Sequence, residues 1–388
     1  MTAREMRYNP VLRKAARLIG SERPPVPPSL PYTLGYEETD GGLFARFWFR
    51  TRGCTHSLGG GCTMCDYWIS TDTDADETRS SVERVLAELR EKQPIDLLIE
   101  TSGSYFDDQE VKPEQRTWML ERFRELSLRY VIVETRTDLR ANDSLKACVE
   151  AIHPATLIVE FGVESLDPWV LKHCINKDTR PGSVQEAVDE VHRCAALATA
   201  NVLIGAPFLS LGEQIEDSAR SLADVLEMGF DTAVLFPVNV KHYTLTGWLR
   251  DREMYQAPPL WALVDVLNSL DTSLLPRVVI SWHRPRPDYH PGYTTRYLRP
   301  ETCPNCYQPL TTLLDEWRKS IDRAALLAQI NSISCACRDE HEVNKSVPNQ
   351  PLLERLRTQQ RRIVDELLGG SWGADYLESI PERESAGA

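Results

Sequence analysis

Apolar residues occur along the chain in short blocks separated by longer stretches with helical spacing. The blocks are rich in β-branched and aromatic residues, which is typical of buried strands. Between the blocks, apolar residues recur every three or four positions, as Val82, Val85 and Leu89 do, which indicates one face of a helix. The predicted strands are 43–49, 95–100, 130–134, 156–161, 201–204, 232–237 and, as a seventh candidate, 277–282; the predicted helices include 80–93, 117–128, 144–151, 184–197 and 213–228.

This alternation of strands and helices predicts right-handed βαβ units around a parallel sheet. Six or so such units could form either a complete eight-stranded barrel or a partial one. Polar residues directly follow most of the predicted strands, as at Thr101-Ser102-Gly103 and Gly162-Val163-Glu164. Because parallel sheets bind ligands at the carboxyl ends of their strands, we expect a site at this edge.

Three cysteines, Cys54, Cys62 and Cys65, lie in one loop directly after the first predicted strand, with glycines at 59–61 that would let the backbone wrap closely around a ligand. Soft thiolates at this density, without a recognisable secretion signal, indicate metal binding more than disulfides. A structural zinc ion and an ordinary iron–sulfur cluster each take four ligands. Three thiolates would therefore leave one iron of a 4Fe–4S cluster open to a small molecule. The alternative is part of a zinc ribbon whose fourth ligand lies elsewhere.

The loop resembles the cysteine motif of the radical S-adenosylmethionine (SAM) superfamily, usually Cys-x3-Cys-x2-Cys. Here the spacing is Cys54-x7-Cys62-x2-Cys65, and a longer first gap is also found in the tRNA-modifying Elongator-type branch. The resemblance implies an α/β fold, a partial (β/α)6 barrel, with a 4Fe–4S cluster and SAM as cofactors. The cluster, reduced by a donor such as flavodoxin or ferredoxin, would cleave SAM to a 5′-deoxyadenosyl radical that abstracts hydrogen from a substrate carbon.

The resemblance also implies roles for residues at the strand ends. The segment Ser102-Gly103-Ser104 would accept hydrogen bonds from the SAM amino group, and Arg136 would bind the SAM carboxylate through a forked guanidinium contact. Glu164 is favoured over Glu134 for the ribose hydroxyls. The predicted cofactor-binding residues are Ser102, Gly103, Ser104, Arg136, Glu164 and Ser165, and the predicted substrate contacts at the same end of the barrel are Tyr67, Tyr105, Asn239, His242 and His283.

A second cysteine group follows near the C-terminus, as Cys303-Pro-Asn-Cys306 and, 28 residues later, Cys335-Ala-Cys337. Two close pairs supply a complete set of four thiolates. One interpretation is a structural zinc ion that ties a C-terminal extension to the barrel. The other is an auxiliary iron–sulfur cluster, which could relay an electron or donate sulfur, and the spacing does not decide between them. The other cysteines, Cys148, Cys174 and Cys194, are single and are expected to be core residues.

Further motifs are similar to the Elongator-like branch, and within it to the radical SAM subunit family of archaeosine synthase. They are Glu134-Thr-Arg136-Thr-Asp138, Phe161-Gly-Val-Glu-Ser165, Ile175-Asn-Lys177, the segments 237–245 and 255–261, and Cys335-Ala-Cys337. That family is a lyase, which splits a C–N bond in a lysine-bearing deazaguanine on tRNA and produces archaeosine. The resemblance therefore implies a tRNA-modifying lyase as one candidate function.

Charge changes this picture, because 57 acidic residues outnumber 44 Lys and Arg and give a net charge of −13. A tRNA enzyme is expected to show a basic face, and here the arginine-rich stretch is 277–299, where arginines alternate with aromatic residues and histidines. Such a stretch suits a free nucleotide at least as well as a whole tRNA. We therefore predict a radical SAM enzyme that acts on a nucleoside- or nucleotide-like small molecule, by C–N cleavage or sulfur insertion, as in antibiotic biosynthesis. A non-catalytic zinc-binding protein on a degenerate barrel is the alternative from another class.

We expect four parts along the chain. These are an N-terminal helix and proline-rich lead-in (1–40), the barrel (41–285), an extension with the second cysteine group (286–370) and a frayed tail (371–388). No apolar run approaches the length of a membrane span, and apolar residues make up 42% of the chain, which predicts a soluble globular protein without membrane contact. Ten cysteines without a recognisable signal peptide favour the cytoplasm.

Overall fold

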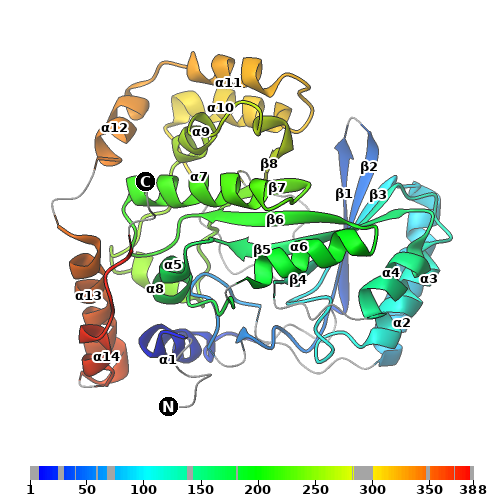
Figure 1. Cartoon of the computed structure of the whole chain (residues 1–388), viewed down its shortest axis with the longest axis horizontal. Helices are drawn as coiled ribbons and strands as arrows, with labels where there is room; N and C mark the ends of the chain where they lie inside the picture. The colour runs from blue at the N-terminus through cyan, green and yellow to red at the C-terminus, as the bar shows by residue number, and fades with distance from the viewer. Residues whose placement is uncertain are drawn as a thin grey trace.

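One eight-stranded sheet forms the centre of the protein, and its strands follow one another in the order β1 to β8 (Figure 1). The structure, a computed structural model, describes residues 8–24, 30–39, 41–57, 60–67, 75–137, 143–180, 182–281, 283, 300–346, 350–370 and 372–384. The strands are β1 (Tyr32–Thr39), β2 (Gly42–Phe49), β3 (Asp96–Glu100), β4 (Tyr130–Arg136), β5 (Thr156–Glu164), β6 (Leu197–Ile204), β7 (Thr232–Pro237) and β8 (Val278–Ile280). β1 and β2 pair antiparallel, and all later neighbours pair in parallel.

Helices follow the parallel strands and cover the outer face of the curved sheet (Figure 1). They are α2 (Ala75–Lys92), α3 (Pro113–Phe123), α4 (Asp143–Ile152), α6 (Ser183–Arg193), α7 (Leu211–Glu227) and α9 (Leu260–Asn268). The predicted partial α/β barrel, built from parallel βα units, is confirmed.

Successive side chains along each strand point to opposite faces of the sheet, so the sheet has an apolar outer face and a polar inner face. In β5, Leu157, Val159 and Phe161 are buried in the core against the helices, whereas the residues between them are only half-buried. Glu160 and Glu164 occupy two of these intervening positions and line a cavity on the inner side. The inner face of the half-barrel therefore presents polar side chains to a cavity and is not a filled apolar core.

Several boundaries differ from the sequence prediction, among them the start of α2 and both ends of α3, and two of the differences have a clear physical reason. The sheet begins earlier than expected, because residues 32–39, which we assigned to the lead-in, form β1 and pair with β2. Little in the sequence indicates this strand, because Gly35 and several polar residues interrupt the alternation of apolar and polar positions in it. The helix expected over 184–197 ends at Arg193, and Leu197 already belongs to β6. The alanine-rich segment after Arg193 has a high helix propensity. It forms a strand instead, because Ala196, Ala198 and Ala200 all point into the core and this tertiary packing outweighs propensity.

The two ends of the chain pack together, around helices α1 (Pro10–Gly20) and α13 (Leu352–Ile363) (Figure 1). The side chain of Asn9 donates to Gln360 Oε1 at 2.9 Å, and Gln360 donates to the carbonyl of His173 at 2.9 Å. Residues 372–384, within the segment that we expected as a tail, pack here, because Leu377 and Ile380 are buried in this second core. Neighbouring short helices are α5 (Pro168–Val170), α8 (Leu245–Arg250), α14 (Ala374–Glu378) and the π-helical turns Leu171–Ile175 and Val364–Leu368.

The C-terminal extension lies beyond β8, beside α9 (Figure 1). A 3-10 turn (Leu275–Arg277) leads into β8, and the extension contains α10 (Pro304–Glu316), α11 (Arg323–Asn331) and α12 (Ala336–Asn344). In the described ranges, we find no helix with the length and apolar composition needed to cross a membrane.

Candidate functional site

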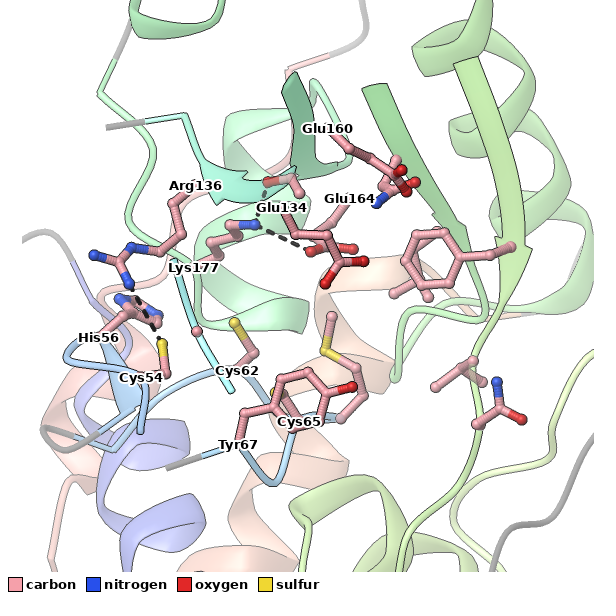
Figure 2. A pocket seen from close by; sticks show the side chains of 18 of the residues that line it. Cys54, His56, Cys62, Cys65, Tyr67, Glu134, Arg136, Glu160, Glu164 and Lys177 are labelled. Carbon is pink, nitrogen blue, oxygen red and sulfur yellow. Dashed lines mark hydrogen bonds and ion pairs between the residues drawn. The ribbon is translucent and has the colours of Figure 1, made fainter. Parts of the chain in front are cut away.

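A cavity opens at the carboxyl ends of the parallel strands, and the cysteine loop forms one side of it (Figure 2). Cys54, Cys62 and Cys65 all line it, and none forms a disulfide. Charged and polar side chains from the strand ends and from neighbouring loops also line it. They are Glu100, Glu134, Arg136, Glu160, Glu164, Lys177, Asn201, Asn239 and Lys241. The structure therefore brings the cysteines and the strand ends together.

The cysteine loop is held from outside by Asn176, which ends the π-helical turn 171–175 in a left-handed conformation with φ of 62°. The Asn176 side chain is fully buried, and its Nδ2 donates to the carbonyls of Gly60 and Gly61, at 2.8 Å each. A Cβ on Gly60 would lie 2.2 Å from the carbonyl oxygen of Arg13, so this close approach requires glycine. The sequence marked 175–177 as a motif without indicating this supporting role.

Arg136 lies beside the first cysteine and between two carboxylates. It donates to Glu110 Oε1 at 2.7 Å and to Asp107 Oδ2 at 2.6 Å, while Nη1 lies 3.5 Å from Cys54 Sγ. Burial raises the pKa of Glu110. Burial would also raise the pKa of Asp107, but hydrogen bonds from Thr55, the Gln109 amide and Arg136 outweigh it and hold that pKa below its usual range. Arg136 thus lines the cavity next to the cysteine loop with its guanidinium held by two carboxylates.

Glu164 occupies an irregular position at the end of β5. Its φ is 68°, and the pairing of β5 with β6 shifts between Gly162 and Glu164. Lys177 donates to Glu164 Oε1 at 3.0 Å and also to the Gly162 carbonyl, whereas Glu164 Oε2 is buried without a hydrogen-bond partner in the described chain. Burial would lower the pKa of Lys177, but Glu164 and Cys62 outweigh burial and raise it, so the lysine is charged. An acceptor oxygen is therefore left for a ligand hydroxyl, consistent with the ribose role predicted for Glu164.

Sequence reasoning missed several cavity residues, among them Glu100, Glu160 and Lys177. Both glutamates fall inside predicted strands, and Glu160 pairs in register with Glu134 on the neighbouring strand. The two-residue period of a strand could have revealed Glu160, because it places Glu160 on the same face of β5 as Gly162 and Glu164. The inner face thus carries carboxylates from three consecutive strands, β3 to β5.

Only some of the predicted cofactor and substrate residues line the cavity. Of the cofactor set, Gly103, Arg136 and Glu164 line the cavity, whereas Ser102, Ser104 and Ser165 are buried and bonded within the protein. Of the substrate set, Tyr67 and Asn239 line it. Tyr105 is fully buried in the core, His242 is exposed, and His283 bonds Asp315 at 2.8 Å. Being near a strand end does not determine which way a side chain points.

The second cysteine group is assembled as predicted, because the sulfurs of Cys303, Cys306, Cys335 and Cys337 lie within 4.8 Å of one another and could hold a second metal ion or cluster. None of the four lines the cavity. The arginine-rich stretch 277–299 lies mostly outside the described residues. Its described member Arg277 donates to the backbone carbonyls of Asp231 and Leu226, which is a structural role.

No family model matches the chain. It is similar to archaeosine synthase subunit beta of Methanosarcina acetivorans, with 27% identity over 224 residues that make up 57% of this chain and 64% of the relative. It is also similar to archaeosine synthase subunit beta of Thermococcus kodakarensis, with 26% identity over 227 residues, 56% of this chain and 68% of the relative. The chain thus spans about two thirds of the length of these relatives.

Solved structures with a similar course of the chain include the archaeal Elp3 of Methanocaldococcus infernus, at a TM-score of 0.45 and 15% identity over 62% of this chain and 58% of that chain. Another is methylornithine synthase, at a TM-score of 0.44 and 14% identity over 61% of this chain and 63% of that chain.

Proposed function

We propose that this chain, a radical SAM protein of the Elongator-like branch, modifies a base carried on tRNA in a reaction of the archaeosine synthase type. The proposal rests on one observation, a cavity that joins three free cysteines to charged strand ends, in a chain whose curated relatives include two archaeosine synthase beta subunits. These relatives favour the tRNA alternative over the small nucleotide-like substrate that we first predicted from the charge.

The donor set fits the cofactors of this superfamily. Three soft thiolates suit iron–sulfur binding and leave one metal position open, and the unpartnered Oε2 of Glu164 suits a ribose hydroxyl. When bound, the cluster and SAM supply a 5′-deoxyadenosyl radical. We assign Cys54, Cys62 and Cys65 to the cluster, and Gly103, Arg136 and Glu164 to SAM.

The remaining cavity residues then orient the substrate. Lys177 holds Glu164 in place, and Tyr67 stacks beneath Lys241, whose ammonium lies 4.5 Å from the ring centroid. Glu134 and Glu160 add carboxylates to the inner face, and Figure 2 shows both on the side of the cavity away from Arg136. Side chains from the loop and from five strands surround this space, which limits water around a reactive intermediate.

The net charge of −13 has a natural explanation in this proposal. The relatives are named as beta subunits, so we propose that a second subunit supplies the basic surface that holds the tRNA backbone. The present chain would then contribute the radical site.

The test measures 5′-deoxyadenosine formed by the reconstituted chain with SAM and a reductant, in a desalted extract of cells from which the gene has been deleted, so that partner subunits are present. Intact tRNA from these cells should stimulate product formation, and nuclease-digested tRNA should not. If free nucleosides or nucleotides stimulate it while intact tRNA has no effect, the tRNA proposal fails and the small-molecule function takes its place.

A further inference from the structure

The four C-terminal cysteines lie much closer together than a cluster requires. Sulfur–sulfur distances are 3.4 Å for Cys303–Cys306, 3.3 Å for Cys303–Cys335 and 3.2 Å for Cys306–Cys337. A single zinc ion with four bonds of about 2.3 Å sets its sulfurs about 3.8 Å apart. A disulfide would need about 2.05 Å. In a cubane, each thiolate binds a different iron at a separate corner, so the four sulfurs must stand farther apart than around one ion.

We propose that Cys303, Cys306, Cys335 and Cys337 bind one Zn²⁺ in a closed tetrahedral site that fastens α10 and α12 to α9, and that they do not bind an auxiliary iron–sulfur cluster. This proposal is independent of the tRNA substrate. It chooses between the two metals that the cysteine spacing left open.

The surroundings of the sulfurs support a metal–thiolate site. Trp261 Nε1, on α9, donates to Cys337 Sγ at 3.3 Å. The hydroxyl of Thr302 lies 3.1 Å from Cys306 Sγ and 3.4 Å from Cys337 Sγ. Such outer hydrogen bonds orient thiolate ligands and spread their negative charge. Cys303 and Cys335 are also the N-cap residues of α10 and α12, where the helix dipole favours negative charge.

Helix α12 needs such a fastening because it has almost no apolar contact of its own. Its one buried residue is His341, and Val343 is 72% exposed. Apart from the cysteines, α12 is joined to α9 by polar and cationic contacts. Asp265 accepts from His341 Nε2 at 2.9 Å and from the following Lys345 at 3.0 Å, and the Arg338 guanidinium lies 4.9 Å from the centroid of the Trp261 ring. A short segment that cannot build a core commonly relies on a metal site.

The position of the group agrees with a structural role. Cys306 is buried in the core that joins the extension to the outer helices, and none of the four cysteines lines the cavity. A cluster that donates sulfur would have to reach the substrate.

The test uses the full-length chain with Cys54, Cys62 and Cys65 all changed to Ala, so that any remaining metal reports on the second group. We expect one zinc per chain, no labile sulfide, and the visible absorption of tetrahedral thiolate cobalt after Co²⁺ replacement. About four irons with sulfide, a single iron in place of zinc, or metal-free protein with two disulfides by mass would each overturn the proposal.

A second measurement does not depend on the variants folding. In the wild-type chain, a mercurial that blocks thiols should release one zinc per chain to a chelating dye, and the same treatment should open 331–346 to proteolysis. Cys194→Ala, a change at a single partly buried cysteine outside both groups, is the matched control and should bind one zinc and release it to the mercurial as the wild type does. Release of zinc without any gain in cleavage would overturn the fastening role.

Discussion

The two cysteine groups of this protein differ in almost every physical respect. The loop group has three sulfurs that line a cavity and do not all lie within 4.8 Å of one another, whereas the C-terminal group has four that do. Glycines and a buried asparagine hold the loop, while the N-termini of two helices present the other group. The comparison teaches that the number of cysteines and the distances between their sulfurs together favour an open site for the loop group and a closed site for the C-terminal group.

Electrostatics sharpens this contrast. Burial raises the pKa of Cys62 and raises that of Cys65 to about 12, so without metal these thiols hold their protons. Burial also opposes ionisation of Cys337, but hydrogen bonds from Thr302 and Trp261 outweigh it and lower its pKa to about 6. The surroundings of Cys337 therefore favour its thiolate form, whereas burial disfavours the thiolate forms of Cys62 and Cys65 until a metal binds.

The largest expected effect comes from removing the loop cysteines. Changing Cys54, Cys62 and Cys65 to Ala should abolish 5′-deoxyadenosine formation and remove about four irons, the content of one cubane. The melting temperature should hardly change, because the loop is held by Asn176 and backbone contacts rather than by the sulfurs. Metal analysis and thermal unfolding check both points, and loss of the zinc as well would mean that the two groups are not independent.

The converse change tests the other group. Cys335→Ser with Cys337→Ser should release zinc and destabilise the extension by more than about 4 kcal/mol, the range typical of losing a structural metal. Iron at the loop should remain, because no C-terminal cysteine lines the cavity. Chemical denaturation of the variant beside Cys194→Ala measures the loss, and an unchanged unfolding midpoint would contradict a structural role.

Asn176→Asp should loosen the loop without touching a cysteine. The new carboxylate would face the carbonyls of Gly60 and Gly61 in place of a donor, at a fully buried position. Leaving buried polar groups unpaired costs about 1–3 kcal/mol each. We expect a lower melting temperature and less iron retained after gel filtration, with zinc unchanged. Asn239→Asp, which loses one 3.3 Å hydrogen bond at a half-buried cavity position, is the control and should keep its iron.

Most of this architecture was predictable from sequence. Periodicity located the parallel strands, and cysteine spacing singled out the two cysteine groups that the fold brings together or places at the cavity. Residues inside strands, such as Glu160, were missed because a continuous strand pattern hides which face each position takes. Tyr105 was misplaced for a related reason, since its ring turns into the core and its hydroxyl reaches the Arg116 carbonyl. Our proposal of zinc rather than a cluster rests on sulfur distances, which no linear spacing encodes.

Glu164→Gln should weaken SAM binding and leave both metals in place. The change keeps the size of the side chain but removes the charge that Lys177 pairs with and alters the unpartnered Oε2 position. Loss of a charged hydrogen bond of this kind costs about 1.5–3 kcal/mol, or roughly a tenfold to hundredfold rise in KM for SAM. Steady-state kinetics at full iron loading measures it, and a fall in kcat with KM unchanged would assign Glu164 to chemistry rather than to binding.

The smallest effect is expected at the ion pair that supports the zinc site. Burial would raise the pKa of Asp265, but hydrogen bonds from His341 and Lys345 outweigh it and hold the pKa below its usual range. An aspartate with a depressed pKa stabilises the fold above its unfolded pKa, and this contribution is lost as pH falls through the folded value. Asp265→Asn should therefore cost about 1 kcal/mol at pH 7, and the difference from wild type should shrink below about pH 4. Thermal unfolding of both proteins across this pH range, with zinc content followed in parallel, measures the difference in stability. A difference that persists undiminished at low pH would show that Asp265 acts through packing rather than through its charge.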